Sequence, residues 1–157
     1  MPESNKQIQQ GETASDFTLK DQNRQDFKLS DVKNKKILLS FHPLAWTSVC
    51  AKQMQSLEAN IDTFASLNTI AVGISVDSVP TKKSWAENLG IKHTQLLSDF
   101  WPHGYVAQLY GIFREDDGFS ERVNIIIDEN NKIMFSKVYP LGELPDIQEI
   151  IQVLENI

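Results

Sequence analysis

The residue in this chain best suited to covalent chemistry is Cys50, its only cysteine. It ends the pattern Pro43-x-x-x-Thr47-x-x-Cys50. A thiol attacks as its thiolate, and a helix N-terminus favours the thiolate because unpaired N–H groups and the helix dipole stabilise an anion there. We therefore expect a reactive thiolate at Cys50, provided that a helix begins just before it.

A thiolate that reduces a peroxide also needs groups that bind the peroxide and support the charge moving onto the leaving oxygen. The Thr47 hydroxyl can donate and accept a hydrogen bond, and the backbone N–H groups of Val49 and Cys50 can donate. Trp46 directly precedes Thr47 within the pattern, so we also consider it as a residue lining the peroxide entrance. A guanidinium would complete the set, because it stays charged and presents several donors.

The chain offers three arginines for this role: Arg24, Arg114 and Arg122. Arg24 lies in a predicted polar turn, and Arg114 lies beside a run of acidic residues. Arg122 immediately precedes the apolar run 123–127, which predicts a strand. Its side chain could reach the end of the sheet that carries Cys50, so Arg122 is the best candidate.

The elements that must position these residues alternate between strands and helices. Short apolar runs predict strands, and apolar residues recurring at spacings of three and four predict helices. The predicted strands cover 37–41, 70–76, 95–97, 123–127 and 133–138; the predicted helices cover about 81–89, 104–110 and 147–154, and a further helix carries Cys50 in its first turn and continues to Phe64.

Two predicted hairpins complete this arrangement. Residues 17–19 and 27–29 alternate apolar with polar side chains around a polar turn, which indicates an N-terminal β-hairpin. The last two strands join at Asn130-Asn131 and must be antiparallel. The order predicts an α/β chain with a central mixed sheet flanked by helices. This is consistent with a thioredoxin-like fold, although other α/β sandwiches fit the pattern too.

Composition limits the class of protein. The 157 residues fit one domain, 1–157, and are 41% hydrophobic and 23% charged, as in a soluble globular protein. A net charge of -6 argues against a nucleic-acid partner. No apolar run approaches the ~20 residues that span a bilayer, and residues 1–10 hold no hydrophobic stretch. With one cysteine, no internal disulfide can form, so we expect a cytoplasmic protein without a membrane partner.

The sequence resembles the peroxiredoxins of the AhpC/TSA superfamily over nearly its whole length. The Pro43-to-Cys50 pattern resembles their active-site signature, and residues 11–43 resemble their opening hairpin and first core strand. The stretch 101–104 (WPHG) resembles the one-cysteine, AhpE-like or bacterioferritin-comigratory-protein-like branch. The resemblance implies a thioredoxin-like fold and a thiol-dependent peroxidase that needs no cofactor.

The resemblance also implies roles at the matching positions. Cys50 would attack a peroxide and become a sulfenic acid, and Pro43 would shield the thiolate. Thr47 and Arg122 would bind and polarise the peroxide. Gln53 departs from the family pattern, because many members carry a Glu there that orients the arginine. A neutral amide can still accept from a guanidinium, but more weakly.

Two further departures are Ser15, where a proline is usual, and His42, where an aromatic residue is common. Because the chain has no second cysteine, an external thiol must reduce the sulfenic acid. The reductant would be a low-molecular-weight thiol such as glutathione, bacillithiol or mycothiol, or a protein of the thioredoxin or glutaredoxin type.

Other functions fit less well. A thioredoxin-type reductase needs Cys-x-x-Cys, and Gln53 occupies the second position. The three histidines, His42, His93 and His103, do not have zinc-ligand spacing, so we assign no metal. A non-catalytic or redox-sensing peroxiredoxin-like protein stays open as the alternative. We expect a homodimer whose surface includes Trp46 and the Trp101 region, because exposed aromatic residues are enriched at interfaces.

Overall fold

The computed structural model describes residues 6–157; residues 1–5 of the polar N-terminal stretch lie outside the described part. The strands are β1 (Thr18–Lys20), β2 (Asp26–Lys28), β3 (Lys36–Phe41), β4 (Thr69–Ser75), β5 (Gln95–Ser98), β6 (Phe113–Arg114), β7 (Phe119–Ser120), β8 (Arg122–Ile127) and β9 (Ile133–Tyr139). The helices are α1 (Ser48–Ala59), α2 (Ile61–Ser66), α3 (Val79–Leu89), α4 (Tyr105–Leu109) and α5 (Ile147–Glu155), with a 3-10 turn η1 (Leu29–Asp31).

Seven of these strands form one mixed sheet in the order β2-β1-β5-β4-β3-β8-β9. The central pairs β3–β4 and β4–β5 are parallel, whereas β3–β8 and β8–β9 are antiparallel. The predicted N-terminal hairpin is present as β1 and β2, and it joins the sheet through β5. The predicted mixed sheet and thioredoxin-like fold are therefore confirmed.

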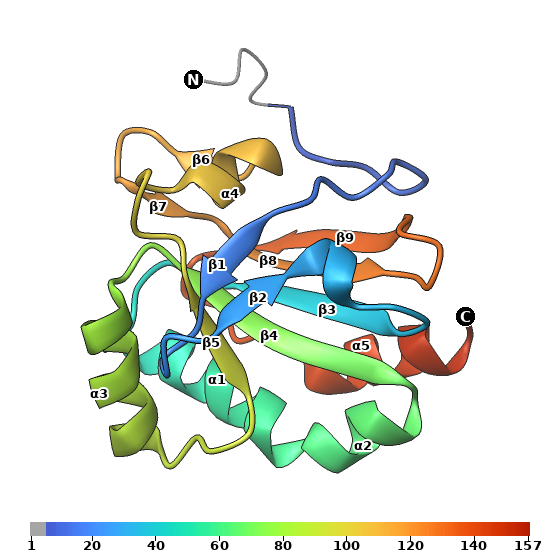
Figure 1. The fold of residues 1–157 in the computed structure, drawn as a ribbon, viewed down its shortest axis with the longest axis horizontal. Coiled ribbons are helices and arrows are strands. Elements are labelled where there is room, and N and C mark those ends of the chain that lie inside the picture. Colours follow the sequence, from blue (N-terminus) through green and yellow to red (C-terminus); the bar gives the residue numbers. More distant parts are fainter. Residues whose placement is uncertain (1–5) are drawn as a thin grey trace.

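The sheet separates two apolar clusters, and neighbouring residues of β3 face different ones. Leu38 packs in the cluster formed with α1, α2, α3 and α5, which lie on one side of the sheet (Figure 1). Leu39 packs in the other cluster, with the N-terminal segment, the first hairpin and α4. Alternation of side chains across a strand explains this division. All six residues of β3 are buried, as the continuous apolar run predicts.

The structure divides the predicted helix 50–64 into α1 and α2. The break lies at Asn60, whose φ of -108° and ψ of 18° are not helical. Its side-chain amide donates to the carbonyl of Ser56 at 2.8 Å. Such a local side-chain bond competes with helical backbone bonds, which explains why the apolar spacing continues while the helix stops.

Other boundaries differ by smaller amounts. Helix α3 begins at Val79, slightly earlier than predicted, because Ser78 caps it by accepting from the Thr81 N–H. Gly90 ends this helix with φ 72°, the left-handed conformation that glycine readily adopts after a helix. The two-residue strands β6 and β7 were not predicted, since a pair that short leaves no periodic signal.

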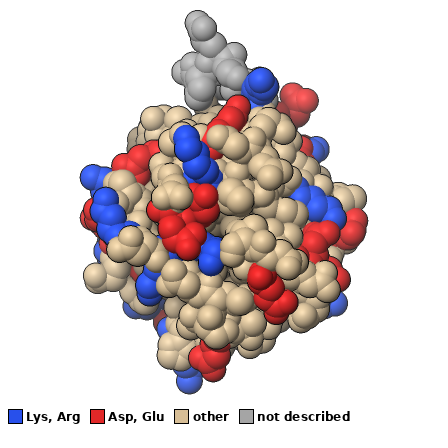
Figure 2. Space-filling model, turned by 90° about the vertical axis from the view of Figure 1, so that its right-hand side faces the viewer, with Lys and Arg blue, Asp and Glu red and all other residues tan. Residues whose placement is uncertain are grey.

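The surface is mixed in charge where Figure 2 shows it. Acidic and basic side chains alternate on this face and form no extended area of one sign (Figure 2). Between residues 6 and 157, no helix has the length and apolar character needed to cross a membrane.

Candidate active site

The active-site loop connects the end of β3 to the start of α1. The Ala45 N–H donates to the Asp77 carboxylate at 2.8 Å, which fastens the loop to the segment after β4. Thr47 has the extended backbone of an N-cap residue, and its carbonyl accepts from the Ala51 N–H at 2.9 Å. Cys50 is therefore the third residue of α1, in the first turn that the sequence predicts.

The Cys50 thiol lies against a guanidinium. Arg122 Nη1 is 3.3 Å from Cys50 Sγ, and the same nitrogen donates to Gln53 Oε1 at 2.7 Å. The other side of the guanidinium donates to the Leu141 carbonyl, from Nε at 3.0 Å and from Nη2 at 2.6 Å. Arg122 is only 3% exposed, so this cation is fixed and shielded from water beside the sulfur.

Strand pairing brings Arg122 to this place. In the β3–β8 pair, Phe41 is opposite Val123, so Arg122 lies at the end of β3 where the active-site loop begins. Of the other two arginines, Arg114 instead pairs with Asp117 and Glu121. The register of two antiparallel strands thus joins residues that are 72 positions apart in the chain.

Gln53 connects this arginine to the sheet. While its oxygen accepts from Arg122, its amide nitrogen donates to Ser40 Oγ at 2.7 Å and to the Phe41 carbonyl at 3.2 Å. Ser40 in turn donates to Asn124 Oδ1 at 2.8 Å. Both ends of the amide are used, so glutamine orients the guanidinium without adding a negative charge next to Cys50.

An open pocket of about 310 Å³ is lined in part by Cys50, which is itself fully buried. The predicted residues Pro43, Thr47, Val49, Cys50 and Arg122 line it, together with Leu44, Ser48, Phe119 and Leu141. The Thr47 hydroxyl donates to the Leu44 carbonyl at 2.7 Å, which leaves its lone pairs to accept a hydrogen bond from a ligand. The pocket thus presents one acceptor, a guanidinium and the N–H groups of a helix N-terminus around one sulfur.

Trp46 is placed differently from the sequence interpretation. It is not among the residues that line the pocket, and the residue is 53% exposed. Its backbone has a φ of 67°, in the turn between β3 and α1. Sequence reasoning also missed Phe119 and Leu141, which reach the pocket from β7 and the loop after β9; neither had a local signal linking it to Cys50.

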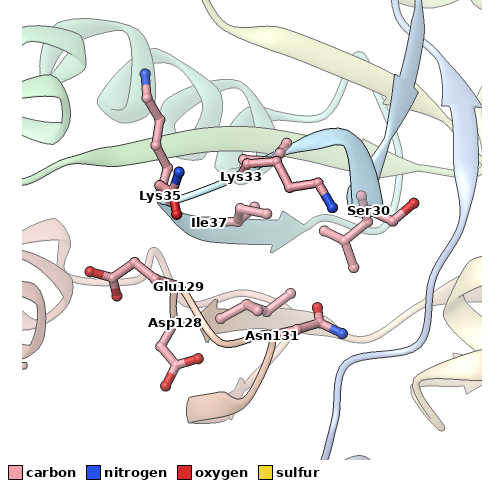
Figure 3. Close-up of a pocket in the computed structure, with 11 residues that line it drawn as sticks. Ser30, Lys33, Lys35, Ile37, Asp128, Glu129 and Asn131 are labelled. Atoms are coloured by element: carbon pink, nitrogen blue, oxygen red, sulfur yellow. The ribbon is translucent and has the colours of Figure 1, made fainter.

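A second hollow, of about 240 Å³, lies at the opposite end of β3 (Figure 3). Its wall includes Lys33 and Lys35 from the segment before β3, and Asp128 and Glu129 from the turn after β8. Charges of both signs meet there, and the only cysteine of the chain lies at the other end of the strand. None of the predicted site residues lines this second hollow.

A thioredoxin-like sheet that holds one thiol at a helix N-terminus, against an arginine and below an open pocket, defines the peroxiredoxin class of thiol-dependent peroxidases. Comparison with known proteins agrees. A profile of the AhpC/TSA family matches residues 10–136, and the chain belongs to this family.

The chain is similar to alkyl hydroperoxide reductase E of Mycobacterium tuberculosis, with 41% identity over 137 residues, 87% of this chain and 89% of the relative. It is 30% identical to a thiol peroxidase of Streptococcus agalactiae, over 84% of this chain and 79% of that protein. The crystal structure of peroxidoxin BcpB from Mycobacterium tuberculosis superimposes with a TM-score of 0.84 at 26% identity, covering 96% of this chain and 98% of that one.

Proposed function

We propose that this enzyme reduces hydrogen peroxide, alkyl hydroperoxides or both, with Cys50 as the attacking thiolate. The observation that carries this proposal is the position of Arg122 Nη1, which is 3.3 Å from Cys50 Sγ and 2.7 Å from Gln53 Oε1. A fixed cation at this distance stabilises the thiolate and also the negative charge that develops on a leaving oxygen.

In the proposed reaction, the Cys50 thiolate attacks one oxygen of ROOH. The S–O bond forms with the sulfur electron pair while the O–O bond breaks, and RO⁻ leaves and takes a proton to become ROH. Cys50 is oxidised to a sulfenic acid and the peroxide is reduced. Arg122 and the N–H groups of the first turn of α1 stabilise the reacting oxygens, Thr47 accepts from the hydroperoxide O–H, and Pro43 closes one side of the pocket.

Recycling needs an external thiol, since this chain has one cysteine. A first R′SH would condense with the sulfenic acid, forming a mixed disulfide and releasing water. The thiolate of a second R′SH would then attack the R′ sulfur of that disulfide, forming R′S–SR′ and releasing Cys50 as its thiolate. The names of two relatives, alkyl hydroperoxide reductase E and thiol peroxidase, support both halves of this cycle. We further propose a homodimer, and a cytoplasmic location because a chain with a single cysteine has no internal disulfide to maintain.

The test is the rate at which peroxide oxidises the reduced protein, followed by stopped-flow tryptophan fluorescence. Hydrogen peroxide and an alkyl hydroperoxide are compared, with Cys50→Ser as the control. We expect second-order rate constants orders of magnitude above that of a free thiol, and no reaction in the variant. Oxidation no faster than a free thiol would instead support the non-catalytic or redox-sensing alternative.

A further inference from the structure

Two basic side chains are buried together next to the active-site loop. Lys82 from α3 and His42, which immediately precedes Pro43, are both 0% exposed. Lys82 Nζ lies 2.8 Å from His42 Nε2. Neither residue lines the Cys50 pocket, so the proposed reaction makes no direct use of them.

The hydrogen bonds of His42 indicate its tautomer. Its Nδ1 lies 3.4 Å from the Ser40 carbonyl, which can only accept, so Nδ1 carries the proton. Nε2 is then the acceptor for Lys82 Nζ. A neutral histidine therefore holds the amine, and the pair carries a single positive charge when Lys82 is protonated.

Packing alone does not account for an amine at this position. The Lys82 amine lies 5.6 Å from the centre of the Trp85 ring, and Trp85 shares an apolar cluster with Cys50. Among the residues described, Lys82 forms no ion pair. Methionine has a similar length and could fill this space without the free-energy cost of removing an ammonium group from water.

The pair lies at the same end of β3 as the thiol: Phe41 is opposite Val123, and the residues that come next, His42 and Arg122, flank that end, where Arg122 contacts Cys50 Sγ. Burial lowers the pKa of Lys82 to about 7, against the opposing effects of Asp77, Cys50 and Asp99. Burial also lowers the pKa of His42, and the nearby cations Lys82 and Arg122 lower it further. Because a negative Cys50 favours the protonated Lys82, a protonated Lys82 must favour the Cys50 thiolate by the same free energy.

We propose that Lys82, held in place by His42, is a positioning residue that stabilises the Cys50 thiolate from the protein interior, as a second cation besides Arg122. It contacts no peroxide and acts only through the charge on Cys50. The inference rests on the proposed function, since it concerns the same thiolate. It predicts that the pair and the thiol titrate as one coupled system.

The first experiment measures the thiolate absorbance of reduced protein near 240 nm against pH. Variants are Lys82→Met, which removes the charge, and Lys82→Arg, which keeps it; the matched control is Lys83→Met, since Lys83 is exposed on the same helix. We expect the midpoint of thiolate formation to rise by about half a pH unit or more in Lys82→Met, as for removal of a nearby opposite charge. Lys82→Arg should restore much of the shift, and Lys83→Met should match the wild type.

Oxidation rates by hydrogen peroxide then separate this role from a structural one. In Lys82→Met the pH of half-maximal rate should rise with the thiolate midpoint, while the limiting rate constant at high pH changes less than twofold. An unchanged midpoint in folded Lys82→Met would overturn the inference. If wild-type oxidation is fast in that case, the proposed peroxidase function stands without it.

A reciprocal measurement does not depend on the folding of Lys82→Met. The His42 ring signals are followed by NMR against pH in wild type and in Cys50→Ser. Without the thiolate, the pair should release its proton at a lower pH, by a shift comparable to that of the thiolate midpoint. Identical titration curves in the two proteins would overturn the coupling.

Discussion

At the scale of single residues, the departure of Gln53 from the family pattern has a structural explanation. Its side-chain amide acts as both acceptor and donor. The oxygen accepts from Arg122, and the nitrogen donates to Ser40 Oγ and to the Phe41 carbonyl. An ionised carboxylate at this position could accept from Arg122, but it has no hydrogen to donate to Ser40 or to the Phe41 carbonyl. The glutamine thus fixes the arginine and leaves its positive charge directed at Cys50.

Replacing Gln53 by leucine tests this explanation. Gln53→Leu removes the acceptor of Arg122 and leaves the Phe41 carbonyl without its amide donor. We expect a loss of about 1–3 kcal/mol in the free energy of unfolding, from the unpaired buried groups. The rate constant for peroxide oxidation should fall about tenfold, which corresponds to roughly 1.4 kcal/mol of transition-state stabilisation. The measurements are urea unfolding and stopped-flow oxidation.

Gln55→Leu is the matched control, because Gln55 is exposed on the same helix. It should leave both quantities close to those of the wild type. If peroxide oxidised Gln53→Leu as fast as the wild type, the Leu141 carbonyl alone would be sufficient to fix the guanidinium.

At the scale of elements, Glu58 near the end of α1 fastens this helix to the segment before β5. Its carboxylate accepts from the Lys92 N–H at 2.8 Å, and from the Thr94 N–H and hydroxyl at 2.9 and 2.8 Å. Burial alone would raise the pKa of Glu58, but the hydrogen bonds from Lys92 and Thr94 outweigh it and lower the pKa below the usual 4.5. The helix that presents Cys50 is thereby fixed at its far end.

We expect Glu58→Gln to lower the free energy of unfolding by about 1 kcal/mol at pH 7. The expected loss is small because the charge-assisted hydrogen bonds of Glu58 are partly exposed to water. A carboxylate with a lowered folded-state pKa contributes stability that is present above 4.5. That contribution disappears as the pH falls through the folded-state value. Urea unfolding of wild type and variant should therefore give curves that converge below pH 4.5.

The exposed Glu87 on α3 supplies the control for this prediction. Glu87→Gln should change the free energy of unfolding little, both at pH 7 and below pH 4.5. If Glu58→Gln remained equally destabilised at low pH, the loss in free energy of unfolding would come from packing rather than from the charge.

At the scale of the whole molecule, the sheet separates two apolar clusters but contributes side chains to both, and we propose that the chain folds as one domain. Leu38 and Leu39 are both 0% exposed and face different clusters. We expect Leu38→Ala and Leu39→Ala each to cost about 2–5 kcal/mol in the free energy of unfolding, from lost burial and a residual cavity.

In a single domain each of these substitutions shifts the whole unfolding transition. Far-UV circular dichroism and tryptophan fluorescence should give coincident curves in both variants. A second, unshifted transition in either variant would show that the two faces unfold independently.

The proposed homodimer depends on exposed aromatic residues. Trp101 is 82% exposed, and Trp46, Phe100 and Tyr105 are each about half exposed: 53%, 50% and 46%. We expect Trp101→Asp to raise the dimer dissociation constant at least tenfold, since a central tryptophan often contributes 2 kcal/mol or more at an interface. Analytical ultracentrifugation over a concentration series measures this.

Ile157→Asp is the matched control, because Ile157 is an exposed apolar residue at the end of the chain, 42% accessible. The Ile157→Asp variant should have the same dimer dissociation constant as the wild type. A wild-type protein that stays monomeric at high micromolar concentration would contradict the homodimer.

Much of the fold could be predicted from local patterns. The buried run of β3, the cap at Gly90 and the turn at Asn130-Asn131 depend on residues close together in the chain. The break at Asn60 was missed because apolar spacing continues through it, although the backbone does not. The pair β6–β7 was missed because two-residue strands show no periodicity.

For the active site, local sequence is enough to predict the proposed nucleophile and its setting: a single cysteine, at a helix N-terminus, after a proline and a threonine. It also indicated Arg122. The contact of Arg122 with the sulfur and its connection to the sheet through Gln53 follow from the folded chain alone, because these contacts depend on the register of β3 against β8. The exposure of Trp46 and the buried Lys82–His42 contact could not be predicted from neighbouring residues either. Burial and long-range contacts depend on how the whole chain packs.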